Sequence, residues 1–139
     1  FGIMGLVSTL VQGVLIKFLS DKISERHLVI TGIIFMIIGL GMIPYGVNFL
    51  GVAIAIGTLS IGSGILQPVV LSLVSKYSPD NIQGAVLGVN QSISAFARFL
   101  GPLWGGFSFD YFGYQFPFLT GAFFTFITLI YVAYKLKMK

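Results

Sequence analysis

The sequence holds one arginine in the middle of a long apolar stretch. Arg98 lies within residues 83–107. A charge at the centre of a membrane-spanning helix costs roughly 2.5–3.5 kcal/mol on insertion scales, so its guanidinium should face protein or water. The four acidic residues lie in gaps or at the ends of apolar stretches: Asp21, Glu25, Asp80 and Asp110. Arg98 is therefore either a structural anchor, held by freed carbonyls or by a carboxylate outside this sequence, or a group that binds an anionic ligand.

Three glutamines within apolar stretches are further candidates for a polar site. Gln67 and Gln91 share helical faces with the small residues of their stretches, and Gln12 lies in the first stretch. Each glutamine can either line a cavity or form an interhelical hydrogen bond. Asn90 is expected on a different face, where it would bond a neighbouring helix.

The sequence contains no constellation typical of an enzyme or a metal centre. It has no cysteine, and its only histidine, His27, stands beside loop charges without a nucleophile or a metal-binding partner. No pair of carboxylates lies inside an apolar stretch. We therefore expect neither enzymatic activity nor a cofactor.

The composition is that of a membrane protein. Of the 139 residues, 56% are hydrophobic and 9% are charged, and the mean hydropathy is +0.98. Soluble domains carry about 25% charged residues. The net charge of +4 would suggest nucleic acid only if the basic residues formed a patch, but they lie in short gaps between apolar runs. We expect an all-α integral membrane protein that binds no nucleic acid.

Five apolar stretches are long enough to cross roughly 30 Å of hydrocarbon as helices. The expected spans cover residues 2–20, 28–45, 49–75, 83–107 and 116–134. They are apolar on all faces instead of alternating with period 2, which disfavours outer-membrane strands. Seven of the eight basic residues flank the first gap, mark the third gap or lie at the C-terminal end. Because positive loops stay in the cytoplasm, we expect a cytoplasmic C-terminus and an N-terminus on the opposite side.

The beginning of the chain is unusual for a membrane protein. It starts at Phe1 without a methionine or a charged leader and enters a span almost directly. We expect a fragment whose upstream part is missing; the alternative is a natural five-span protein with its initiator removed.

Two kinds of helix are expected among the five spans. The second and fifth are apolar all round and should face lipid. The third and fourth each carry a stripe of small and polar residues that lets membrane helices pack closely, and each contains a proline that favours a kink. The residues assigned to packing and kinks are Gly64, Pro68, Gly84, Gly88, Gly101, Pro102, Gly105 and Gly106.

Several of these residues form a recognisable series. Ile61-Gly-Ser-Gly-Ile-Leu-Gln-Pro68, Asn90-Gln91-Ser92, Ala97-Arg98 and Gly101-Pro102-Leu-Trp-Gly105-Gly106 resemble the C-terminal half of a major facilitator superfamily permease. Within that superfamily the sequence is most similar to bacterial drug-efflux transporters of the tetracycline-resistance type. The resemblance covers essentially the whole chain. It implies helices 8 to 12 of twelve, most of the C-terminal six-helix bundle, with one further helix and the N-terminal half missing.

Two family motifs match numbered residues. The segment Leu19-Ser-Asp21-Lys22-Ile-Ser24-Glu25-Arg26 resembles a loop motif that latches neighbouring helices in one conformation. Asp21 would take its acidic position, and Lys22 and Arg26 its basic ones; an ordinary positive-inside loop is the alternative. Gly101-Pro102-x-x-Gly105-Gly106 resembles the tail of a motif that antiporters carry in helix 5, here in the equivalent helix 11.

The resemblance implies secondary-active transport of a small molecule by alternating access, in which two halves rock around a site near the midplane. It further implies proton-coupled efflux of a drug-like or amphipathic compound by a multi-pass protein of the cell (inner) membrane. Gln12, Gln67, Gln91 and Arg98 are then candidates for the substrate pathway. No acid lies at membrane depth, so the proton-carrying group is expected in the missing N-terminal half. The alternative is a non-transporting membrane scaffold whose glycine stripes serve helix packing only.

Overall fold

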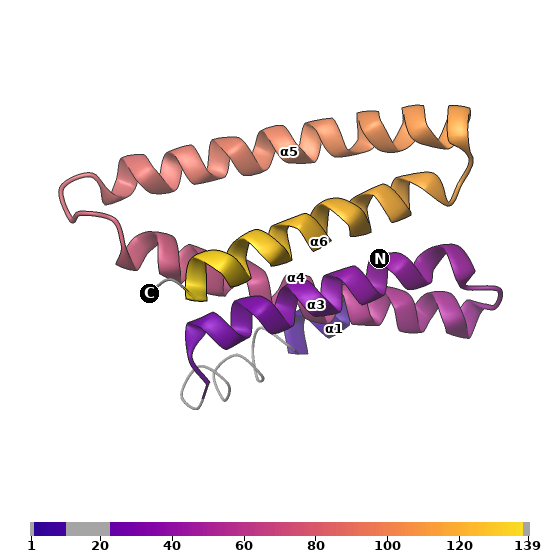
Figure 1. The fold of residues 1–139 in the computed structure, drawn as a ribbon, viewed down its shortest axis with the longest axis horizontal. Helices are drawn as coiled ribbons and strands as arrows, with labels where there is room; N and C mark the ends of the chain where they lie inside the picture. Colours follow the sequence, from indigo (N-terminus) through magenta and orange to yellow (C-terminus); the bar gives the residue numbers. More distant parts are fainter. Residues whose placement is uncertain (1, 11–22, 138–139) are drawn as a thin grey trace.

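The computed structural model describes residues 2–10 and 23–137, which form long helices joined by short turns (Figure 1). No strand occurs in these two ranges. Successive helices run back along one another, so the turns gather at the two ends of the molecule (Figure 1). The elements are α1 (Gly2–Leu10), α3 (Glu25–Met42), the 3₁₀ helix η2 (Ile43–Tyr45), α4 (Phe49–Lys76), α5 (Gln83–Phe112) and α6 (Phe116–Lys137).

Three helical segments within the described ranges are long and apolar enough to cross a membrane: Glu25–Tyr45, Phe49–Lys76 and Phe116–Lys135. The all-helical, membrane-type architecture expected from the composition is confirmed at this level. With 30 residues α5 is longer than all three, but Asn90, Gln91 and Arg98 make its central part more polar. Only nine residues of α1 are described. The count of five spans stays a prediction.

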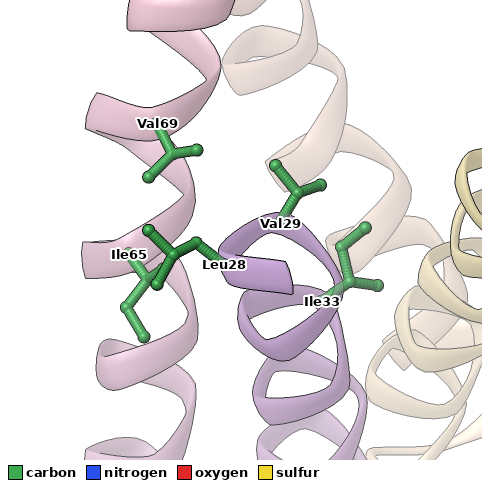
Figure 2. Close-up of a cluster of buried hydrophobic side chains, with 5 residues drawn as sticks. All are labelled: Leu28, Val29, Ile33, Ile65 and Val69. Atoms are coloured by element: carbon green, nitrogen blue, oxygen red, sulfur yellow. The ribbon is translucent and has the colours of Figure 1, made fainter. Parts of the chain in front are cut away.

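The core lies where α3 packs against α4 (Figure 2). Leu28, Val29 and Ile33 of α3 meet two α4 residues, Ile65 and Val69, and all five are buried. Residues of α6 pack against the same cluster, among them Leu129 and Val132. Because lipid is as apolar as these side chains, close van der Waals packing stabilises this contact in a membrane more than the hydrophobic effect does.

Three glycines bring α3 and α4 close together. A Cβ built on Gly39 would lie 2.6 Å from the Leu59 nitrogen, and one built on Gly62 would lie 2.6 Å from the Gly32 carbonyl oxygen. A Cβ on Gly32 would lie 2.7 Å from Leu66 Cγ. Backbone therefore approaches backbone at this interface, as small residues allow in membrane helices. The glycines predicted from the sequence to serve packing do not include these three.

The prediction that the second span simply faces lipid is wrong for one of its faces. α3 lies between α4 and α6 and buries Leu28, Val29 and Ile33 against them. Its outer face keeps Ile34 and Ile38 exposed. A helix that is apolar on all faces can lie against lipid or against other helices, because both surroundings are apolar.

α5 stands apart from the other helices (Figure 1). Ser108 is its only buried residue. Gln83 Nε2 joins its start to α4 by donating to the Ser75 carbonyl at 2.9 Å, and Trp104 Nε1 joins it to α6 by donating to Thr120 Oγ1 at 3.2 Å. Both α4 and α5 continue through their internal prolines, Pro68 and Pro102.

The glycines assigned to packing divide between two situations. Gly64 is buried in α4. In α5, a Cβ at any of five positions would meet no heavy atom within 4 Å in the part of the chain that the structure describes: Gly84, Gly88, Gly101, Gly105 and Gly106. A packing role for these five requires a partner from elsewhere, and it stays a prediction.

Candidate functional site

An open groove of about 830 Å³ lies between α4 and α5, and Met36 of α3 reaches its wall. We call it the central groove. Its polar lining residues are Gln67, Asn90, Gln91, Ser94 and Arg98, and its other lining residues are Met36, Leu66, Pro68, Val70, Leu71 and Ala97. Three residues that the sequence analysis selected, Gln67, Gln91 and Arg98, therefore border one space.

Helical spacing explains how α5 presents these side chains together. Gln91 and Arg98 are seven residues apart, which is about two helical turns, so they lie on one face. Asn90 and Ala97 have the same separation and also share a face. Around the helix axis, Ser94 falls between these two faces. The prediction that Asn90 points away from this face was wrong, because the groove spans an arc wide enough to include two adjacent positions.

Arg98 is exposed, and it lies near the middle of α5. Within residues 2–10 and 23–137 the one ion pair is Lys76–Glu25, so no carboxylate pairs with the Arg98 guanidinium. The guanidinium also forms no hydrogen bond to a carbonyl of these residues. Nor does any carboxylate line the central groove among the described residues. The groove therefore carries an uncompensated positive charge from its own lining residues.

The amide side chains of the groove keep their hydrogen-bonding capacity. Gln67 and Gln91 are exposed and Asn90 is half-buried. Unlike them, Ser94 bonds within its own helix, with Oγ donating to the Asn90 carbonyl at 2.8 Å. The interhelical hydrogen bond considered for Gln67 and Gln91 is not formed between described residues.

The chemistry of the central groove suits an amphipathic guest. A guanidinium offers up to five N–H donors in a planar fork, and each amide offers donors and an acceptor. The same groove is also lined by Met36, Leu66, Val70 and Leu71, which suit an apolar portion. The described residues contain no cluster of three or more histidine, aspartate or glutamate side chains that could hold a metal ion.

Other predicted site residues fall elsewhere. Gln12, Asp21 and Lys22 lie outside the described residues. Arg26 lies in the first turn of α3 and lines a second groove at that end of the bundle. Nothing in the described ranges tests the latch role of this segment, which stays a prediction.

A charged contact that was not predicted from the sequence lies at the same end. Lys76 Nζ lies 3.3 Å from Glu25 Oε2, and Ser72 Oγ donates to Glu25 Oε1 at 3.4 Å. Glu25 stands in the first turn of α3 and Lys76 in the last turn of α4, so each charge also complements its helix dipole. The sequence does contain a signal for this pair: an acidic residue at the start of one helix and a basic residue at the end of the next.

The chain is similar in sequence to a known protein family and to individual known proteins. Residues 1–138 match the sequence model of the Major Facilitator Superfamily. An uncharacterized MFS-type transporter of Mycobacterium tuberculosis is 29% identical over 118 residues, covering 84% of this chain and 20% of that protein. Hippocampus abundant transcript-like protein 1 of Rattus norvegicus is 29% identical over 106 residues, covering 76% and 21%. The chain thus spans about a fifth of the length of these relatives. No solved structure matches it.

Proposed function

The chain belongs to the major facilitator superfamily, and from this premise we propose that its central groove forms part of the substrate pathway of a secondary-active transporter. Members of this family are membrane transporters and not enzymes. Family membership and a relative named as a transporter support transport in general. Because the chain spans about a fifth of its relatives, the activity of the whole protein is part of the proposal.

One observation carries the proposal. Gln67 of α4 and Gln91 and Arg98 of α5 border the same open groove, although they come from two helices. A cationic side chain inside a membrane helix is costly and normally faces a partner or water. An open groove whose guanidinium and amides bond no other described side chain supports a role in binding a polar or anionic group of a passing solute.

The proposed substrate class rests on the two kinds of side chain that line the groove. The cation and amides suit an anionic or hydrogen-bonding group, while Met36, Leu66 and Leu71 suit an apolar body. We therefore favour a drug-like or amphipathic compound, moved outward by alternating access. The exposed length of α5 supports a partner half of the same transporter across the groove. A proton-carrying carboxylate would belong to that half, and the basic residues at the end of α6 support a cytoplasmic C-terminus.

Transport by the intact protein in energised membrane vesicles tests the proposal. We expect movement of a fluorescent amphipathic compound that an uncoupler abolishes. Arg98→Gln should reduce this movement, and Arg98→Lys should restore part of it because the charge returns. Ile127→Ala on the exposed face of α6 is the control and should leave movement unchanged. Movement that is insensitive to the uncoupler would contradict secondary-active transport.

A membrane scaffold is the second candidate, and a specific observation favours it. The five α5 glycines that meet no described atom leave a smooth helix face on which another helix could pack. A scaffold would transport none of the compounds tested in energised vesicles. Removal of a helix that packs on the α5 glycines would weaken the assembly of the scaffold.

A further inference from the structure

A second open groove, of about 880 Å³, lies at the end of the bundle where α3 begins and where α4 and α6 end. We call it the end groove. Apolar side chains from three helices line it, including Val29, Val74 and Val132, and two cations stand at its rim, Arg26 and Lys135. We propose that the end groove binds an anionic phospholipid, whose acyl chain lies on the apolar wall and whose phosphate lies between Arg26 and Lys135.

The apolar wall is a built part of the bundle. Val29 belongs to the buried core cluster, and Val132 packs against that cluster. The wall therefore includes side chains of α3 and α6 that pack against the core. An acyl chain gains dispersion contacts against such a wall, whereas water finds no polar partners there.

The rim lies at the level expected for lipid headgroups. One membrane-type segment begins at Glu25, another ends at Lys76, and the third ends at Lys135. The charged residues of the end groove are thus at the boundary between hydrocarbon and water. Basic residues at this level attract anionic lipids, with about 1 kcal/mol for each Lys or Arg near the surface.

The charges of the end groove favour an anion. No described residue forms an ion pair with Arg26 or Lys135. Glu25 is the acid that lines the groove, but its carboxylate is already engaged by Lys76 at 3.3 Å and by Ser72 at 3.4 Å. Arg26 can hold two phosphate oxygens with its planar fork, and Lys135 adds a second positive charge.

Lipid retention by the purified intact protein tests the proposal. Native mass spectrometry in detergent would compare phosphatidylglycerol with phosphatidylcholine of identical acyl chains. We expect preferential retention of phosphatidylglycerol, weakened about fivefold by Lys135→Gln and about 25-fold by Arg26→Gln with Lys135→Gln. Phosphatidylcholine retention should stay unchanged.

A steric pair separates the groove from general surface charge. Val132→Trp should occupy the space beside the apolar wall of the end groove and reduce phosphatidylglycerol retention. Ile130→Trp, at an exposed position of the same helix, should not reduce it. Equal retention of the two lipids by the unmodified protein would overturn the proposal, and so would a double variant that retains phosphatidylglycerol normally. Displacement of the lipid by millimolar inorganic phosphate would show a site for free phosphate and would also overturn it. Lys135 is exposed, so its single variant gives a result even where the double variant does not fold.

Discussion

The ammonium of Lys76 lies 3.3 Å from the carboxylate of Glu25, so the last turn of α4 is joined to the first turn of α3. The two side chains are 62% and 35% exposed, and solvent screens their attraction. Exposed ion pairs contribute about 1 kcal/mol or less. The pairing of Glu25 with Lys76 therefore matters more for the charge balance of the end groove than for stability.

The first prediction concerns this ion pair. Lys76→Met should lower the free energy of unfolding by less than about 1 kcal/mol, because the pair is exposed. A double-mutant cycle with Glu25→Gln, followed by thermal unfolding in detergent, measures the coupling. A coupling of several kcal/mol would contradict the weak role given to this contact.

The second prediction concerns the glycine contact between α3 and α4. Gly62→Ala should lower the free energy of unfolding by about 1–3 kcal/mol, because overpacking forces the backbone to shift. The added Cβ would meet the Gly32 carbonyl oxygen at 2.6 Å and the Met36 nitrogen at 2.7 Å. Gly57→Ala is the matched control on the same helix, since a Cβ there meets nothing within 4 Å. Equal stability of the two variants, measured by thermal unfolding, would argue against a close α3–α4 contact.

The third prediction concerns Arg98. A hydrogen bond to a charged group contributes about 1.5–3 kcal/mol, so Arg98→Ala should lower kcat/KM for transport by roughly 10- to 100-fold. Its thermal unfolding should change little, because the guanidinium is exposed and forms no ion pair with a described residue. A variant that transports normally would remove Arg98 from the pathway. A variant that loses stability instead would favour the structural-anchor alternative.

The fourth prediction concerns the open glycine face of α5. In the intact protein, Gly105→Leu should lower the free energy of unfolding by about 1–3 kcal/mol if another helix packs there. Gly41→Leu on α3 is the control, since a Cβ at that position also meets nothing within 4 Å. Thermal unfolding that is unchanged in both variants would leave the α5 glycines without a packing role.

The sequence predicts the helices well because their signal is local. Long runs of apolar residues demand helices in a membrane, and α3 to α6 lie over four such runs. The shared face of Gln91 and Arg98 follows in the same way from a separation of two helical turns. Only their meeting with Gln67 depends on how α4 and α5 pack.

The sequence does not predict which apolar helix is central. α3 is apolar all round, and lipid and protein core make the same demand on such a helix. The contact with α4 is marked by Gly32, Gly39 and Gly62, whose partners belong to another helix. The pairing of Glu25 with Lys76 likewise joins residues 51 positions apart. The predicted face of Asn90 was wrong because the width of the central groove depends on tertiary packing.

The most direct test of the central groove is water access at position 91. The 139 residues contain no cysteine, so Gln91→Cys can be compared with Ile127→Cys, which lies on the exposed apolar face of α6. A maleimide reacts with the thiolate, which forms in water and not in hydrocarbon. If the groove is a substrate pathway, a water-soluble maleimide labels position 91 much faster than position 127, and a transported compound slows labelling at 91 alone. Equally slow labelling at both positions, or labelling at 91 that no transported compound affects, would contradict this function.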